Sequence, residues 1–205
     1  FGRTQWRAQI RCILLPEAHV QGPRAGDPHP VAGFAEVVGE GRDEAEAAAV
    51  CESGMAAISA LVMTVLKPGD ELVYMGPLYG GTEGFFLDTL ARYGISILEA
   101  ETTAELEGKL SNRCKMVYLE TPTNPTLKIT DLQEVARVAH LHGALAVTDN
   151  TFCTPYLTQP LEHGFDVVLH SMTKYLGGHG DALGGVLAGS SELMLQVRME
   201  GLRHF

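Results

Sequence analysis

The sequence has no long apolar run and few basic residues, and both absences exclude partners. The longest nearly apolar stretch, residues 56–66, contains two hydroxyl side chains and is too short to cross a bilayer, so we expect no membrane association. The 15 lysines and arginines form no dense cluster, and the formal net charge is −10. This charge opposes the counterion release that drives binding to nucleic acid, so we expect no nucleic-acid partner.

Cysteine is also scarce, and its spacing argues against a metal centre. The four cysteines lie at positions 12, 51, 114 and 153, with no CxxC pair and no His/Cys cluster of zinc spacing. The pattern favours reduced thiols over a structural zinc site. We therefore expect a cytoplasmic protein without a metal.

The chain divides into an irregular and a regular region. Glycine, proline, arginine and histidine are scattered through "VQGPRAGDPHPVAG" without a sustained period, which predicts an irregular N-terminal arm over residues 1–42. From residue 43 to 205, short apolar runs alternate with amphipathic stretches of helical length. This second region is predicted to be one α/β domain.

The alternation predicts an open, mostly parallel sheet with helices on both faces. The predicted strands are residues 48–51, 71–75, 95–99, 116–120, 145–148, 166–170 and 185–188, and the predicted helices are residues 55–66, 82–93, 103–110, 132–142 and 192–202. In such sheets ligands bind beyond the carboxyl ends of the strands. The residues that follow each strand are therefore the candidates for function.

Three of these strand ends carry residues that could contact a ligand. Ser53 and Gly54 precede a helix whose first N–H groups and dipole would favour an anion, although a plain N-cap serine would look the same. In "GPLYGGT", glycines flank Tyr79 and would let its ring approach a ligand; the alternative is a surface loop with a half-buried tyrosine. In "LETPTNP", the prolines could hold Asn124 toward one acceptor, and a turn without function would look similar.

Two further strand ends carry opposite charges. Asp149 ends an apolar strand, where a carboxylate is destabilising unless a cation or hydrogen-bond donors meet it. Lys174 follows another strand, and an amine in apolar or cationic surroundings can attack carbonyls. A structural salt bridge between the two is the alternative. Ser171 and Thr173 add two hydroxyls that can bind an anion beside the lysine.

Taken together, these residues describe one cofactor. A lysine for carbonyl chemistry, an anion site, a carboxylate suited to a protonated ring nitrogen and an aromatic ring for stacking are the four needs of pyridoxal 5'-phosphate (PLP). Among the common cofactors, no other needs all four.

Five motifs carry a family resemblance over residues 48–205. These are "SGMAAI", "PLYGGT", "ETPTNP", "DNTFCTPYL" and "HSMTKYLGGHGD", in that order. The sequence resembles the Cys/Met-metabolism, or trans-sulfuration, family of PLP-dependent enzymes, and within it is most like the methionine γ-lyases. The resemblance implies a fold-type I PLP-dependent transferase fold, related to aspartate aminotransferase, with residues 43–205 as the PLP-binding large domain and the C-terminal small domain absent from this chain.

The resemblance also implies roles for individual residues. Lys174 matches the lysine that forms a Schiff base with PLP, Asp149 the partner of the pyridine nitrogen, and Tyr79 the stacking tyrosine that can also act as an acid. The backbone of Gly54 and Met55 matches the donors to the phosphate.

Further roles follow for residues around the phosphate and the phenolic oxygen of the cofactor. Ser171 and Thr173 match additional phosphate ligands, and Asn124 matches the residue near the phenolic oxygen, with Glu120 supporting it. Arg24 matches an arginine that reaches the phosphate of a neighbouring subunit. The family's usual tyrosine is replaced by Gly22 in that element.

The function implied is that of a PLP-dependent carbon–sulfur lyase. Its substrate would be a small molecule, the amino acid methionine or cystathionine, which γ-elimination would convert to a thiol, a 2-oxo acid and ammonia. The resemblance also implies a homo-oligomer built as a dimer of dimers. Methionine γ-lyases commonly carry cysteine where this chain has Gly81, which argues against strict specificity for methionine. One alternative is a γ-replacement enzyme, such as a cystathionine γ-synthase or an O-acetylhomoserine sulfhydrylase. Another is a truncated module that binds PLP without catalysis.

Overall fold

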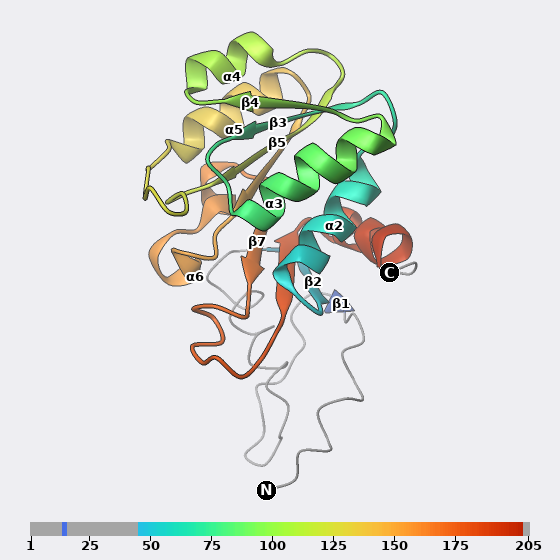
Figure 1. The fold of residues 1–205 in the computed structure, drawn as a ribbon. Coiled ribbons are helices and arrows are strands. Elements are labelled where there is room, and N and C mark those ends of the chain that lie inside the picture. Colours follow the sequence, from blue (N-terminus) through green and yellow to red (C-terminus); the bar gives the residue numbers. More distant parts are fainter. Residues whose placement is uncertain (1–13, 16–44, 203–205) are drawn as a thin grey trace, which may run out of the picture.

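The computed structural model describes residues 14–15 and 45–202, and within them eight strands form one sheet (Figure 1). The strand order is β1-β2-β8-β7-β6-β5-β3-β4. The strands are β1 (Leu14–Leu15), β2 (Ala47–Cys51), β3 (Glu71–Met75), β4 (Ser96–Ala100), β5 (Cys114–Glu120), β6 (Leu145–Asp149), β7 (Val167–Ser171) and β8 (Gly185–Gly189). Strands β4, β3, β5, β6 and β7 pair in parallel, as the sequence predicted for most of the sheet.

The direction of strand β8 is a feature that sequence reasoning did not identify. The strand runs antiparallel to both β7 and β2. Residues 172–184, which connect β7 to β8, contain turns but no helix that could cross a face of the sheet, so the chain folds back beside β7. Because β8 is antiparallel to both neighbours, β2 points the same way as the parallel strands. The carboxyl end of β2 therefore lies at the same edge as theirs.

The helices cover both faces of the sheet. They are α2 (Gly54–Val65), α3 (Gly80–Gly84), η1 (Phe85–Thr89), η2 (Leu90–Tyr93), α4 (Thr103–Lys109), α5 (Leu132–Leu141), α6 (Thr154–Leu157), η3 (Pro160–His163), α7 (Ser191–Gln196) and η4 (Val197–Gly201). One apolar cluster joins α2 and η4 to one face, and a second joins α4 and α5 to the other (Figure 1). The layered α/β architecture predicted from the sequence is confirmed.

Two predicted helices have local changes of winding. The stretch predicted as one helix over residues 82–93 starts at Gly80 and passes through the π-helix η1 and the 3-10 helix η2. The last helix likewise changes from α7 to the π-helix η4. The short helices α6 and η3 were not predicted from the sequence, because four-residue segments are too short to show a helical period.

Most of the predicted N-terminal arm, residues 1–42, lies outside the described residues, and so does Arg24. The exception is β1, whose two leucines pair antiparallel with β2. In the part of the chain that the structure describes, no helix is long and apolar enough to span a membrane.

Candidate cofactor site

A cavity of about 760 Å³ lies at the carboxyl edge of the sheet, and predicted site residues line it. The lining includes Gly54, Met55, Tyr79, Asn124, Asp149, Ser171, Thr173 and Lys174. These residues come from five different strand ends or the loops that follow them. The structure therefore brings together every predicted site residue that it describes.

The two carboxylates of the cavity are placed by strand register and alternation. Glu120 and Asp149 are register partners at the last positions of β5 and β6. Two residues earlier, Tyr118 and Val147 pack in the core cluster that contains α2. Because side chains alternate along a strand, Glu120 and Asp149 lie on that same face. Both carboxylates therefore lie on the α2 face, at the edge where the cavity lies.

Asp149 is held by the turn that follows β6. Its Oδ1 accepts hydrogen bonds from the Thr151 N–H, at 2.9 Å, and from the Thr151 hydroxyl. That hydroxyl oxygen accepts the Ser171 N–H at 2.8 Å, which ties the end of β6 to the end of β7. Desolvation raises the pKa of the Asp149 carboxyl, and the bonds from Thr151 oppose this rise. Sequence reasoning missed Thr151, although it follows the "DN" of the motif.

The N-terminus of α2 approaches the same region. The Ser53 hydroxyl caps the helix by accepting the Ala56 N–H at 3.0 Å, so Ser53 is the ordinary N-cap considered above. Gly54 packs against β7 so closely that an added Cβ would lie 2.9 Å from the Cβ of Ser171. The first turn of a helix has N–H groups without intrahelical partners, and its dipole favours an anion. Serine as a cap and an anion site beside it are therefore compatible.

We expect Gly54→Ala to weaken PLP binding at least tenfold. The new methyl group would force α2 and Ser171 apart, and the N–H groups of the helix would move with it. Titration of the full-length protein with PLP, followed by visible absorbance, measures the effect. Gly108→Ala is the matched control, because nothing lies within 4 Å of a Cβ added there. Equal affinity in both variants would contradict the placement of the phosphate at this helix.

Lys174 does not occupy the buried strand end that its sequence context suggested. Strand β7 ends at Ser171, and Lys174 lies in the following turn, where it is exposed and lines the cavity. Main-chain hydrogen bonds close the turn, among them one from the Lys174 N–H to the Ser171 carbonyl at 3.1 Å and one from the Gly178 N–H to the Lys174 carbonyl at 2.9 Å. The amine is thus available at the cavity without being buried in the core.

Neighbouring residues hold this turn against β8. The Thr173 hydroxyl accepts the Gly184 N–H at 3.2 Å and donates to the Gly184 carbonyl at 3.3 Å. The rings of Phe152 and Tyr175, 6.0 Å apart, join the loop after β6 to the turn. Both rings line the cavity, and neither was predicted as a site residue. Isolated aromatic residues in loops carry no periodic signal by which they could have been found.

Tyr79 lies beside the cavity at the start of α3. Its ring is 51% exposed, and a Cβ added to Gly81 would lie 2.6 Å from the ring carbon Cε1. The glycine is therefore required for the observed position of the ring. The main chain of Tyr79 is also fixed, because its N–H donates to Oε1 of Glu120 at 2.9 Å.

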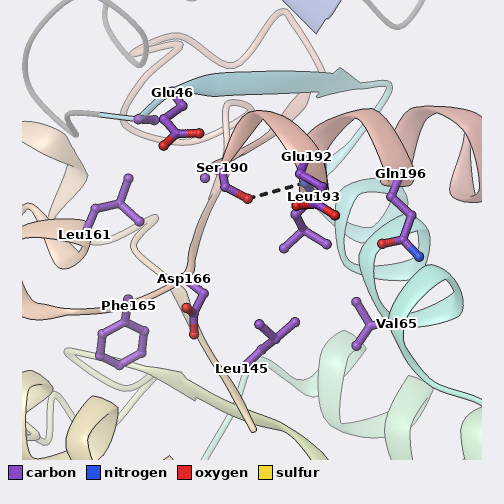
Figure 2. Close-up of a pocket in the computed structure, with 12 residues that line it drawn as sticks. Glu46, Val65, Leu145, Leu161, Phe165, Asp166, Ser190, Glu192, Leu193 and Gln196 are labelled. Carbon is purple, nitrogen blue, oxygen red and sulfur yellow. Dashed lines mark hydrogen bonds between the residues drawn. The ribbon is translucent and has the colours of Figure 1, made fainter. Parts of the chain in front are cut away.

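A second cavity, of about 560 Å³, lies at the opposite edge of the sheet (Figure 2). Two of its three carboxylates have structural partners: Glu46 accepts the Ser191 N–H at 2.9 Å, and Asp166 accepts the Ala146 N–H at 2.7 Å and pairs with His140. None of the predicted site residues lines it. In the described residues, no group of three or more His, Cys, Asp or Glu side chains could hold a metal ion. The candidate site is therefore the cavity at the carboxyl edge.

The residues of that cavity fit PLP. Within residues 45–202 no salt bridge involves Asp149, so a cavity-lining carboxylate of raised pKa is suited to a protonated ring nitrogen. The closely packed Gly54 places a helix N-terminus where a phosphate can approach, and Lys174 presents an amine to the same space. Fold and site define an α/β domain of the PLP-dependent enzyme class.

Comparison with known proteins identifies the family. The model of the Cys/Met metabolism PLP-dependent enzymes matches residues 38–203, so the chain belongs to this family and its cofactor is PLP. The chain is 43% identical over 164 residues to an L-methionine γ-lyase of Fusobacterium nucleatum subsp. polymorphum, an alignment covering 78% of this chain and 42% of the relative. It is 44% identical over 142 residues to a cystathionine γ-synthase/O-acetylhomoserine (thiol)-lyase of Bacillus subtilis, and this alignment covers 68% of this chain and 38% of the relative.

A solved structure is similar over the same part of the chain. The cystathionine γ-lyase of Lactobacillus plantarum, crystallised with L-serine, superposes with a TM-score of 0.75 at 34% identity, covering 83% of this chain and 45% of that one. The chain thus spans about two-fifths of the length of the relatives it matches. These three proteins carry names of both elimination and replacement enzymes.

Proposed function

We propose that this chain is the PLP-binding part of a carbon–sulfur lyase that removes a thiol from the γ carbon of methionine or cystathionine and, with the uptake of one water molecule, releases a 2-oxo acid and ammonia. The observation that carries the proposal is the meeting of Lys174, Asp149 and Tyr79 at one cavity in a chain of this family. An L-methionine γ-lyase is among its relatives, which supports elimination. A homo-oligomer remains a prediction, to be checked by light scattering.

Each residue has a task that its position supports. When bound, PLP supplies an electron sink that stabilises negative charge on a substrate carbon. Asp149 would keep the ring nitrogen protonated, and the N–H groups at the start of α2 would bind the phosphate. Lys174 would hold the cofactor through its amine, and the same amine would carry a proton away from the α carbon of the substrate. Tyr79 would stack on the ring and protonate the departing sulfur.

A γ-replacement enzyme is the second candidate, because one relative is a cystathionine γ-synthase/O-acetylhomoserine (thiol)-lyase. The chain also has Gly81 where the family resemblance leads us to expect the cysteine common in methionine γ-lyases, which argues against strict specificity for methionine. The structure shows that any side chain at 81 would collide with the present position of the Tyr79 ring. Feeding the full-length protein methionine, cystathionine or an O-acyl-homoserine with a thiol distinguishes the two candidates. A product formed only with the added thiol would favour replacement.

We expect Gly81→Ala to lower kcat/KM about tenfold or more with the preferred substrate, because it displaces the ring of Tyr79 and small displacements near reacting atoms are costly. Steady-state kinetics with a stopped thiol assay measures the change. Gly80→Ala is the matched control, since an added Cβ there meets nothing within 4 Å. If Gly81→Ala had the kinetics of Gly80→Ala, the position of Tyr79 would be irrelevant to the reaction.

A further inference from the structure

Glu120 makes a contact at the cavity that the proposed mechanism does not use. It ends β5, is 5% exposed, and its Oε1 accepts the Tyr79 N–H at 2.9 Å although 41 positions separate the two residues. The family resemblance placed Glu120 in support of Asn124, whereas its hydrogen bond leads to the main chain of Tyr79. The contact joins the central sheet to the loop that carries the aromatic ring.

The other side of the Tyr79 main chain is also fixed. Its carbonyl accepts the N–H groups of Thr82 at 2.9 Å and Glu83 at 3.0 Å, which begin α3. Tyr79 makes no capping bond with its own side chain, so its ring is free to extend to the cavity. Because both the N–H and the carbonyl of Tyr79 are hydrogen-bonded, the main chain from which the ring extends is fixed. The place of the ring therefore depends on where Glu120 holds the N–H.

The charges around Glu120 do not explain its burial as an ion pair. Within the described residues no salt bridge reaches it. Burial first, and then the nearby carboxylates of Asp149 and Glu83, raise the pKa of Glu120 to about 8, while the bond from Tyr79 opposes the rise. Burial and the neighbouring carboxylates therefore favour the neutral form of this acid. To accept the Tyr79 N–H, the side chain at position 120 needs an oxygen atom but no negative charge, and a neutral carboxylic acid provides such an oxygen.

We propose that Glu120 is a positioning residue that sets where the Tyr79 ring lies against the cofactor through its hydrogen bond to the Tyr79 main chain. This inference rests on the proposed function, which places PLP beside Tyr79. The position of the ring requires the acceptor oxygen of residue 120 and does not require a carboxylate charge there.

The test compares three variants of the full-length protein loaded with PLP. Glu120→Gln keeps an acceptor oxygen, Glu120→Leu removes it with similar bulk, and Glu52→Gln alters an exposed carboxylate that follows β2 at the same edge. Visible circular dichroism of the bound cofactor reports its contact with the ring, and absorbance titration gives the dissociation constant for PLP.

We expect Glu120→Leu to reduce the dichroic band at least twofold and weaken PLP binding about tenfold, since the loss of one partly buried hydrogen bond changes an equilibrium constant by up to about this factor. Glu120→Gln and Glu52→Gln should stay within about twofold of the wild type. Hydrogen exchange at the Tyr79 amide should quicken in Glu120→Leu alone. A wild-type-like Glu120→Leu variant, or a Glu120→Gln variant as impaired as Glu120→Leu, would overturn the inference and leave the proposed function intact. A wild type without a cofactor band would overturn both.

Discussion

Replacing Lys174 by alanine should abolish the visible absorption of the PLP-loaded protein and lower kcat by about 10³-fold or more. Lys174 lines the cavity as an exposed amine, and the proposed function assigns it both the attachment of PLP and the movement of the substrate proton. General acid–base catalysis alone contributes about 10²–10⁴-fold. Absorbance spectroscopy and a thiol-release assay measure the two effects separately.

Two further measurements make the Lys174 prediction specific. Lys115→Ala, at an exposed position on β5, should keep both the band and the activity. Borohydride reduction of the wild type should attach the cofactor to the peptide that contains Lys174, as read by mass spectrometry. Attachment to another lysine, or an unchanged band in Lys174→Ala, would refute the assignment.

Replacing Asp149 by asparagine should weaken PLP binding by about 10²–10³-fold. The removal of one partner from a buried charge pair costs about 3–5 kcal/mol, and about 1.4 kcal/mol is tenfold. Because Asp149 is half-buried, we expect the lower part of this range, about 3–4 kcal/mol. Asparagine keeps the shape and an oxygen for the Thr151 N–H. The loss therefore measures the charge opposite the ring nitrogen, and equilibrium dialysis with PLP determines it.

The pH dependence of binding gives a second measure of Asp149. Desolvation raises the pKa of its carboxyl in the free protein, so protonation competes with the charged ring nitrogen. Affinity for PLP should rise as the pH passes upward through this pKa and level off above it. The carboxyl of Glu120 lies close to Asp149 and also has a raised pKa, so the measurement is repeated in the Glu120→Gln variant. The rise in PLP affinity with pH must still be seen in that variant. A rise of equal size in Asp149→Asn would assign it to another group.

The sequence could predict much of the site because its signals are local. Asp149 ends an apolar run and Gly54 begins a helix, so the neighbouring residues in the sequence are enough to indicate both as candidate site residues. The common edge follows from the direction of the parallel strands. Motif order then indicated which strand ends belong together.

Other features depend on contacts between distant residues and could not be predicted. The bond from Tyr79 to Glu120 joins a loop to the end of the distant strand β5. The collision of an added Cβ at Gly81 with the Tyr79 ring depends on a side-chain rotamer. Apolar runs do not indicate strand direction, so β8 was predicted as a strand but its antiparallel direction was missed. The exposure of Lys174 arises because a turn follows β7, which a strand pattern does not reveal.

The most direct test of the account is product analysis of the full-length, PLP-loaded protein incubated in turn with L-methionine and L-cystathionine, with no other thiol or amino acid. The account predicts that one of them yields thiol, 2-oxo acid and ammonia in equal amounts, and that Lys174→Ala yields none of the three. A protein that carries the cofactor band yet forms no 2-oxo acid from either substrate would contradict the proposed elimination.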